Sequence, residues 1–252
     1  MNDLTRRQAL AALGAATCAG PTVASGRRHY ALIALVGDEL ELTHGNPEIG
    51  SSLDRNVRKS MPDADAAFDK IALLALQEEV KRNDRNAQVS LLGVPPSRLH
   101  REPERLFDGN TIALPGSLVD ALTASQATHV VLLTKRRAPT KIPMVGGPIG
   151  YGNLRGLGYY VDNFSKVVVR DTGQAATGLL AVFVYVQLTL ADARTGQIVA
   201  QRPIESALSQ PVALAQSADP WEALAPQQKF EALRALLQTQ LRKEMPALLA
   251  GS

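Results

Sequence analysis

Cysteine is almost absent from the sequence. Among its 252 residues only Cys18 carries a thiol, so the chain beyond it can form neither a disulfide nor a thiolate metal site. The histidines show no His-x-x-x-His or Cys–His spacing of a metal site. We therefore predict no metal and no cofactor, with a site of one histidine and carboxylates as the alternative. The histidines concerned are His29, His44, His100 and His129.

Aromatic residues are scarce, and neither sign of charge dominates. Phe, Trp and Tyr make up 4% of the chain, which argues against a platform of stacked aromatics for single-stranded nucleic acid. The formal net charge is only +3, whereas nucleic-acid binders concentrate far more positive charge on one face. We expect no nucleic-acid partner. The 45% of hydrophobic residues is typical of a globular chain that buries a sizeable core.

No hydrophobic run reaches the roughly 20 residues that a membrane-spanning helix needs. The apolar run at residues 9–19 instead follows a short polar stretch that contains Arg6 and Arg7. A charged stretch before a short apolar run is the layout of an export signal. The arginine pair, with Leu10 behind it, resembles the twin-arginine motif.

The predicted signal peptide covers residues 1–24, which leaves residues 25–252 as one mature periplasmic domain. Small residues precede this cleavage point, and cleavage after Ala19 is an alternative. A lipid anchor at Cys18 is another alternative, although the threonine before it fits a lipobox poorly. The remaining alternative is a cytoplasmic chain that begins with a short amphipathic helix.

The rest of the chain alternates between strand and helix patterns. Strands are expected at residues 30–36, 39–43, 88–94, 128–134, 159–170, 179–191 and 197–206, and helices at 60–82, 117–125 and 221–249. We predict one α/β domain with a mixed sheet, helices packed against it and a long C-terminal helix. Its C-terminal half is expected to be an antiparallel meander.

Several local details are predicted as well. Residues 39–43 could pair with 30–36 through a turn at Gly37 and Asp38, and residues 44–60 should form a loop. Ser60 is expected to cap the first helix, with Pro62 in its first turn. Whether the strand pair at 159–191 lies in the core or projects as an arm is left open.

A segment rich in glycine and proline, residues 135–158, interrupts the pattern. We predict a loop that is either functional or mobile, because it is longer than an ordinary connection. Its glycines miss the dinucleotide-binding spacing and precede a strand rather than a helix, so no phosphate site is predicted.

A candidate partner-binding surface is predicted from the cations and tyrosines in and beside this loop. Such groups suit an anionic lipid, a glycan or a protein. We expect a protein or glycan partner from the cell envelope, with peripheral membrane association as an alternative and a merely solvated loop as another. The candidate residues are Lys135, Arg136, Arg137, Lys141, Tyr151, Arg155, Tyr159 and Tyr160.

No catalytic residue is predicted. The sequence has no Gly-x-Ser-x-Gly or Ser-x-x-Lys nucleophile motif. The triplet Asp171-Thr172-Gly173 matches the core of aspartic proteases, but it occurs once and is typical of a turn between strands. A non-enzymatic protein is therefore expected. A hydrolase of unknown substrate and a binder of a small ligand, held between sheet and helices, are the alternatives.

Residues 186–199, Val-Gln-Leu-Thr-Leu-Ala-Asp-Ala-Arg-Thr-Gly-Gln-Ile-Val, resemble the paired strands of one envelope family. That family includes the amino-terminal domain of TolB, the curli secretion lipoprotein CsgG and the LpoB-type activators of peptidoglycan synthases. The helix and strand at residues 118–133 are similar to its preceding unit, without the family's Asp before the strand. The resemblance implies a periplasmic accessory fold that binds other envelope components and has no catalytic centre.

Overall fold

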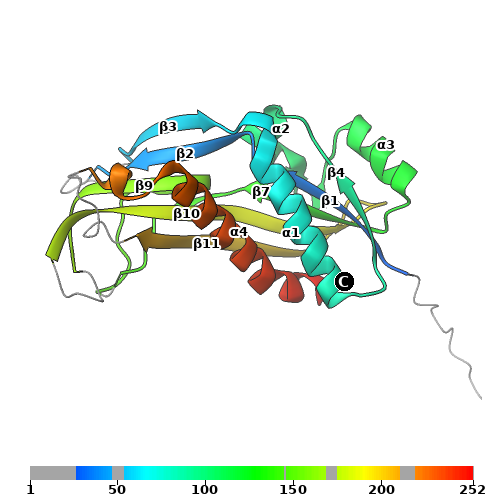
Figure 1. Cartoon of the computed structure of the whole chain (residues 1–252). Helices are drawn as coiled ribbons and strands as arrows, with labels where there is room; N and C mark the ends of the chain where they lie inside the picture. Colours follow the sequence, from blue (N-terminus) through cyan, green and yellow to red (C-terminus); the bar gives the residue numbers. More distant parts are fainter. Residues whose placement is uncertain (1–26, 47–53, 145, 169–174, 211–218, 252) are drawn as a thin grey trace, which may run out of the picture.

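A mixed β-sheet forms the centre of the computed structural model, which describes residues 27–46, 54–144, 146–168, 175–210 and 219–251 (Figure 1). The predicted α/β fold is confirmed. The strands are β1 (His29–Leu35), β2 (Glu39–His44), β3 (Val57–Pro62), β4 (Gln88–Leu92), β7 (His129–Lys135), β8 (Arg137–Pro139), β9 (Asn153–Val168), β10 (Ala175–Asp192) and β11 (Ile198–Gln210), with β5 (Phe107–Asp108) and β6 (Thr111–Ile112) as a separate pair. The helices are α1 (Ala67–Asn83), α2 (Arg98–Arg101), α3 (Gly116–Ser125) and α4 (Pro226–Leu249), with short 3-10 turns at Ala64–Ala66, Pro103–Leu106 and Pro220–Ala223.

The long strand β10 organises the sheet. One of its edges pairs antiparallel with β9 along its first half and with β7 along its second half, while β11 pairs with the other edge. Strand β1 pairs in parallel with β7, and β2 pairs in parallel with β9. The antiparallel meander predicted for the C-terminal half is therefore present as β9, β10 and β11. Between β7 and β9 the chain leaves the sheet, and we call residues 136–152 the excursion.

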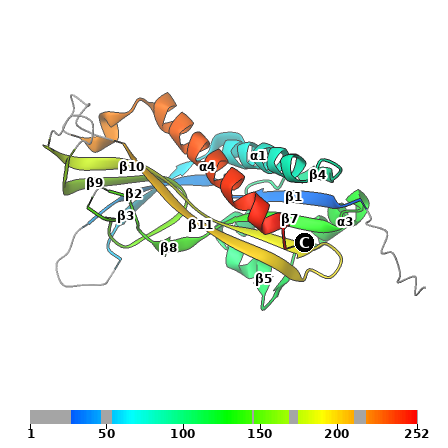
Figure 2. The same ribbon diagram turned by 90° about the horizontal axis from the view of Figure 1, so that it is seen from below.

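The sheet is buried on both faces, which explains its nearly continuous apolar strands. The side chains of Tyr30–Val36 in and after β1, and of Leu179–Val186 in β10, are at most 1% exposed. Figure 2 shows α1 and α4 on one side of the sheet and β5 and β8 on the other. Each face of the sheet therefore needs its own layer of covering segments.

Helix α4, predicted as a long C-terminal helix, covers one face through an apolar stripe. Leu233, Leu237 and Leu241 recur at helical spacing and are fully buried, and Met245 continues the row. They pack in one cluster with residues of α1 and with the same face of β1, β7, β9 and β10. Full burial of each such side chain stabilises the fold by about 2 kcal/mol, so this face holds the sheet and both helices together.

Two separate covers protect the opposite face. Residues of α3 and of the segment around β5 and β6 pack on β1 and β7. The excursion and the start of β9 supply Ala138, Ile142 and Leu154, which pack on Phe183 and Tyr185 of β10. The predicted loop at 135–158 is therefore wrong in part, since it contains the end of β7, all of β8 and the start of β9.

Strand β2 does not form a hairpin with β1, contrary to the prediction. It continues in the same direction and pairs with β3 and β9. Gly158 permits this pairing, because a Cβ there would lie 1.9 Å from the carbonyl oxygen of Glu41. No side chain can be accommodated at that distance.

The first helix begins later than predicted. Residues 57–62 form β3 rather than the end of a loop and a helix cap, and Ser60 donates to Glu39 on β2. Helix α1 begins at Ala67, where the Asp63 carboxylate accepts the Phe68 N–H at 2.8 Å. Pairing with β2 therefore makes residues 57–62 a strand, although their local sequence predicts a loop and the start of a helix.

The strand pair at 159–191 belongs mainly to the core. Residues 179–186 are fully or almost fully buried, while the end of β9 and the start of β10 extend past the other strands in Figure 1. Where the strand pair leaves the core, the buried Asp162 carboxylate accepts the N–H groups of Phe164 and Ser165. The side chain of Phe164 is already 59% exposed. The triplet at 171–173 and the predicted signal peptide lie outside the described residues. No described helix has the length and apolarity needed to cross a membrane.

Candidate functional site

The excursion alternates between buried and exposed side chains. Ala138, Thr140 and Ile142 face the sheet and are at most 8% exposed. The residues that alternate with them, from 137 to 143, are exposed, and we call this set the outer row. The outer row consists of Arg137, Pro139, Lys141 and Pro143. One side of the excursion thus completes the core while the other presents cations to solvent.

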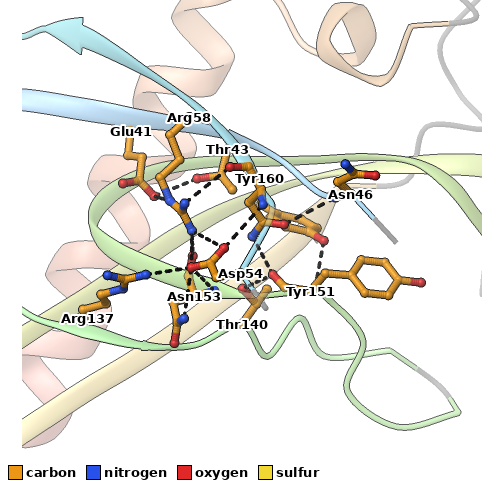
Figure 3. A network of polar contacts seen from close by, with 11 residues as sticks. Glu41, Thr43, Asn46, Asp54, Arg58, Arg137, Thr140, Tyr151, Asn153 and Tyr160 are labelled. Atoms are coloured by element: carbon orange, nitrogen blue, oxygen red, sulfur yellow. Dashed lines mark hydrogen bonds and ion pairs between the residues drawn. The ribbon is translucent and has the colours of Figure 1, made fainter. Parts of the chain in front are cut away.

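Asp54 fastens the excursion to the edge of the sheet (Figure 3). Its carboxylate accepts from Arg58 of β3 at 2.6 and 2.7 Å, from Arg137 at 2.8 Å and from the Asn153 side chain at 3.0 Å. Gly152 makes room for this carboxylate, because a Cβ there would lie 2.3 Å from Asp54 Oδ1. Three segments that are distant in sequence are therefore joined at one side chain.

The charge of Asp54 is strongly stabilised. Burial opposes its ionisation, but the hydrogen bonds from Arg58, Asn153 and Arg137 outweigh this effect and hold the pKa of Asp54 well below its usual range. Nearby on β2, burial raises the pKa of Glu41, although Thr43 donates to it at 2.7 Å and the Arg58 Nε lies 3.6 Å away. Asp54 is thus the main acceptor of the network, and Glu41 is a second, partly desolvated one.

Buried tyrosine hydroxyls hold the backbone of the excursion at two further points. The backbone N–H of Tyr151 donates to the Tyr160 hydroxyl at 3.1 Å, and that of Lys141 donates to the Tyr185 hydroxyl at 3.0 Å. The Tyr151 carbonyl accepts from Asn56 at 2.6 Å and from Thr140 at 2.8 Å. Burial raises the pKa of Tyr160 and of Tyr185, so both hydroxyls stay protonated.

Three of the predicted partner-binding residues are not available to a partner, so the prediction is wrong for them. Lys135 is 7% exposed and forms an ion pair with Asp38 where β1 passes into β2. Tyr160 faces the excursion, and Tyr159 faces the helices, where its ring meets the Trp221 ring edge-on at 5.4 Å. Burial raises the pKa of Tyr159 to about 12. Neighbouring strand residues point to opposite faces, and here both faces are covered.

The other five predicted residues reach the surface. The side chains of Arg136, Arg137 and Lys141 are 41%, 61% and 60% exposed, and Tyr151 is 37% exposed. Arg136 and Lys141 share Glu205 of β11, at 3.2 and 3.7 Å. The fifth, Arg155, is partly buried and donates to the backbone carbonyl of Arg101.

Sequence reasoning missed the anchors of this surface. Asp54 and Asn153 are 99 residues apart, and Arg101 and Arg155 are 54 apart. Neither pair belongs to a recognisable spacing, because contacts between distant strands leave no local pattern. Only the glycines at 150–158 hinted at a close approach of the backbone in this region.

A second polar cluster closes the junction between β1 and β2. Asp69 of α1 accepts the N–H groups of Val36 and Gly37 at 2.7 and 2.8 Å, and its other oxygen lies 2.9 Å from Nε2 of the fully buried His100. Ser97, 3.4 Å from the other ring nitrogen, also accepts the Leu99 N–H as the cap of α2. These bonds satisfy buried backbone groups, so the cluster has a structural role.

The described residues contain no group of three or more His, Cys, Asp and Glu side chains able to hold a metal ion. Two of the histidines considered from the sequence make other contacts. His29 is 2.9 Å from the Ser90 hydroxyl, and the His129 ring contacts the Tyr30 ring in a tilted arrangement, with 5.3 Å between ring centroids. Burial lowers the pKa of His129, which favours its neutral form at neutral pH.

No protein-family model and no curated protein matches the chain. A protein from Helicobacter pylori, described as a neuraminyllactose-binding hemagglutinin homolog, is 10% identical with a TM-score of 0.40 over 89% of this chain and 82% of its own. A Xanthomonas campestris protein of a family of unknown function is 10% identical with a TM-score of 0.37, covering 88% and 81%. The PelC dodecamer from Paraburkholderia phytofirmans is 11% identical with a TM-score of 0.29, covering 88% of each chain. At such low identities and TM-scores these similarities carry no argument about function.

Proposed function

We propose that this chain is an exported, non-catalytic protein of the bacterial cell envelope that binds another envelope component through the outer row of the excursion. The alternation of the excursion is the observation that carries this proposal. Its inner residues complete a hydrophobic core, whereas Arg137 and Lys141 stand outside with more than half of their side chains exposed.

The anchoring of the excursion supports a binding role. The Asp54 network and the hydroxyls of Tyr160 and Tyr185 fix its backbone before any partner arrives. A surface that is already ordered loses little conformational entropy on association. The Lys141–Glu205 ion pair on its outside is long, at 3.7 Å, and the lysine side chain is 60% exposed. Such pairs contribute little to stability, so an incoming anion can take the place of Glu205 at small cost.

The predicted signal peptide supports the location. Every described helix and strand lies beyond residue 24, since the first strand begins at His29. Removal of residues 1–24 would therefore leave all of these elements intact. The resemblance to the TolB, CsgG and LpoB family remains a prediction and points to the same compartment.

Affinity capture from envelope extracts tests the proposal. The wild-type chain is compared with Arg137→Gln/Lys141→Gln, which removes two exposed cations and leaves the buried Lys135 in place. The matched control, Arg234→Gln/Lys243→Gln, removes the same charge from α4 on the opposite face of the sheet. We expect the captured component to be lost only with the excursion variant. Equal capture by all three proteins would refute the assignment of the outer row.

A further inference from the structure

Two arginines face each other across the short ladder between β8 and β9. Arg137 pairs directly with Arg155 in the antiparallel register. Side chains in such a pair lie on the same face of the ladder, only a few ångströms apart, and like charges there are destabilising. A like-charge pair at this position therefore calls for a compensating anion.

The carboxylates near this pair are already shared. Asp54 accepts from Arg137 and also from Arg58. Glu41 attracts both Arg58 and Arg155, and the hydrogen bond that Arg155 donates goes to a neutral carbonyl. The described carboxylates thus leave an excess of positive charge beside Arg155.

The excess continues along the surface in both directions. On one side, the Arg101 side chain is exposed on α2, next to the carbonyl that holds Arg155. On the other side, Lys141 follows Arg137 in the outer row, about 13 Å away for four residues of extended chain. We call this set the basic band, and it runs from one cover of the sheet to the other. The basic band consists of Arg101, Arg155, Arg137 and Lys141.

The carboxylates at the two ends do not neutralise the basic band. Glu102 of the α2 segment is shared by Arg98 and Arg105, at 2.9 and 2.5 Å. Glu205, at the Lys141 end, is shared with Arg136. Each acidic group therefore meets two cations, and the band as a whole stays positive.

From this arrangement we propose that the basic band binds a linear anionic polysaccharide whose carboxylate groups lie between Arg155 and Arg137 and extend to Arg101 and Lys141 at its two ends. The guanidinium fork matches a carboxylate in two parallel hydrogen bonds, which a point charge cannot do. A linear row of cations fits a polymer with repeated charges. This inference rests on the proposed function and names the chemistry of its partner.

Features of the outer row favour a polysaccharide over a peptide. A peptide that binds by strand addition needs backbone N–H donors, and Pro139 and Pro143 of the outer row have none. Tyr151, partly exposed at the end of the excursion, instead offers an aromatic face with a polar tip. Such a face can stack on a sugar ring.

The test uses the full chain and polygalacturonate, a linear polymer of carboxylated sugars, with neutral dextran, poly-glutamate and duplex DNA as comparison ligands. We expect polygalacturonate to bind most tightly and dextran not to bind. The affinity should fall as salt rises, because the contacts are between exposed charges. Arg101→Gln/Lys141→Gln should weaken binding about tenfold or more, as expected for two charge-assisted contacts. Arg234→Gln/Lys243→Gln should stay within about twofold, since exposed charges on the far side are screened.

Each other outcome overturns the inference. Equal affinity of the two double variants would show that overall charge, not the basic band, drives binding. Tighter binding of poly-glutamate would assign the band to an acidic peptide, and equal binding of DNA would show a non-selective polyanion surface. If polygalacturonate does not bind while capture from envelope extracts still depends on Arg137 and Lys141, this inference fails and the proposed function stands. Circular dichroism of every variant confirms that it is folded.

Discussion

Replacement of Asp54 by asparagine should destabilise the protein through the excursion. The substitution keeps the shape of the side chain but removes the charge that accepts from Arg58, Arg137 and Asn153. A hydrogen bond to a charged group is worth about 1.5–3 kcal/mol, and an exposed ion pair less than about 1 kcal/mol. Arg58 is 31% exposed and Arg137 is 61% exposed, so Arg58 should carry most of the effect.

The expected loss for Asp54→Asn is about 3 kcal/mol of unfolding free energy. For a chain of this size, each kcal/mol lowers Tm by roughly 2–4 °C, so a decrease of about 6–12 °C is expected. The fluorescence of Trp221, the only tryptophan, and far-UV circular dichroism both report the transition. Glu231→Gln, in an exposed pair with Arg234 whose side chains are 43% and 45% exposed, should change stability by less than about 0.5 kcal/mol.

The effect of Asp54 should also depend on pH in a defined direction. Its pKa in the fold lies below that of an unfolded aspartate, about 3.9. The stabilisation is therefore fully present above the unfolded value and is lost as pH falls through the lower, folded value. The difference between wild type and Asp54→Asn should be constant from about pH 5 to 8 and should shrink below about pH 4. A Tm difference under about 2 °C at pH 7, or one that grows in acid, would refute the account of the network.

Further predictions concern the sheet, its junction and the signal peptide. Gly158→Ala should lower the free energy of unfolding by about 3 kcal/mol or more in urea, because the new Cβ would meet the Glu41 carbonyl. The control Gly116→Ala has nothing within 4 Å of its new Cβ and should stay within about 0.5 kcal/mol. Equal effects of the two substitutions would contradict the close approach of β2 and β9. Asp69→Ala should cost about 3 kcal/mol by leaving two buried N–H groups unpaired, and a neutral result would show that the junction between β1 and β2 rearranges. Arg6→Lys/Arg7→Lys should leave unprocessed chain in the cytosol of its native host, which fractionation and mass spectrometry would detect. Normal processing of this variant would exclude the twin-arginine route.

Local hydrophobic pattern was sufficient for most of the fold. Strands β1, β4 and β7 and helix α3 begin and end within two residues of their predicted positions, because each is a short apolar run or periodic stripe between clear end signals. A tight turn at 192–196 joins the last two predicted strands, where Asp192 accepts the N–H groups of Arg194 and Thr195 and Gly196 has a φ of 71°. These elements depend on neighbours in the sequence, so the sequence reports them directly.

The strands that the sequence analysis did not predict are polar or very short. Val57–Pro62 forms β3 because β2 offers an edge to pair with, and β8 forms because the excursion folds back on β9. Val57–Pro62 lacks the apolar alternation of a half-buried strand, and β8 has only three residues, which are too few for a pattern. Their structure follows from backbone pairing with distant residues, which leaves little local trace.

The sequence alone determined that this protein is an α/β chain with few aromatics, a buried sheet, a long C-terminal helix and a basic segment near residue 140. Tertiary structure decided what each charge in that segment does. Lys135 is enclosed with Asp38, Arg137 is fixed by Asp54, and Arg155 reaches Arg101. The reason is physical: periodicity along the chain sets which face of an element is apolar, whereas the environment of a charge depends on side chains that only the packed fold brings beside it.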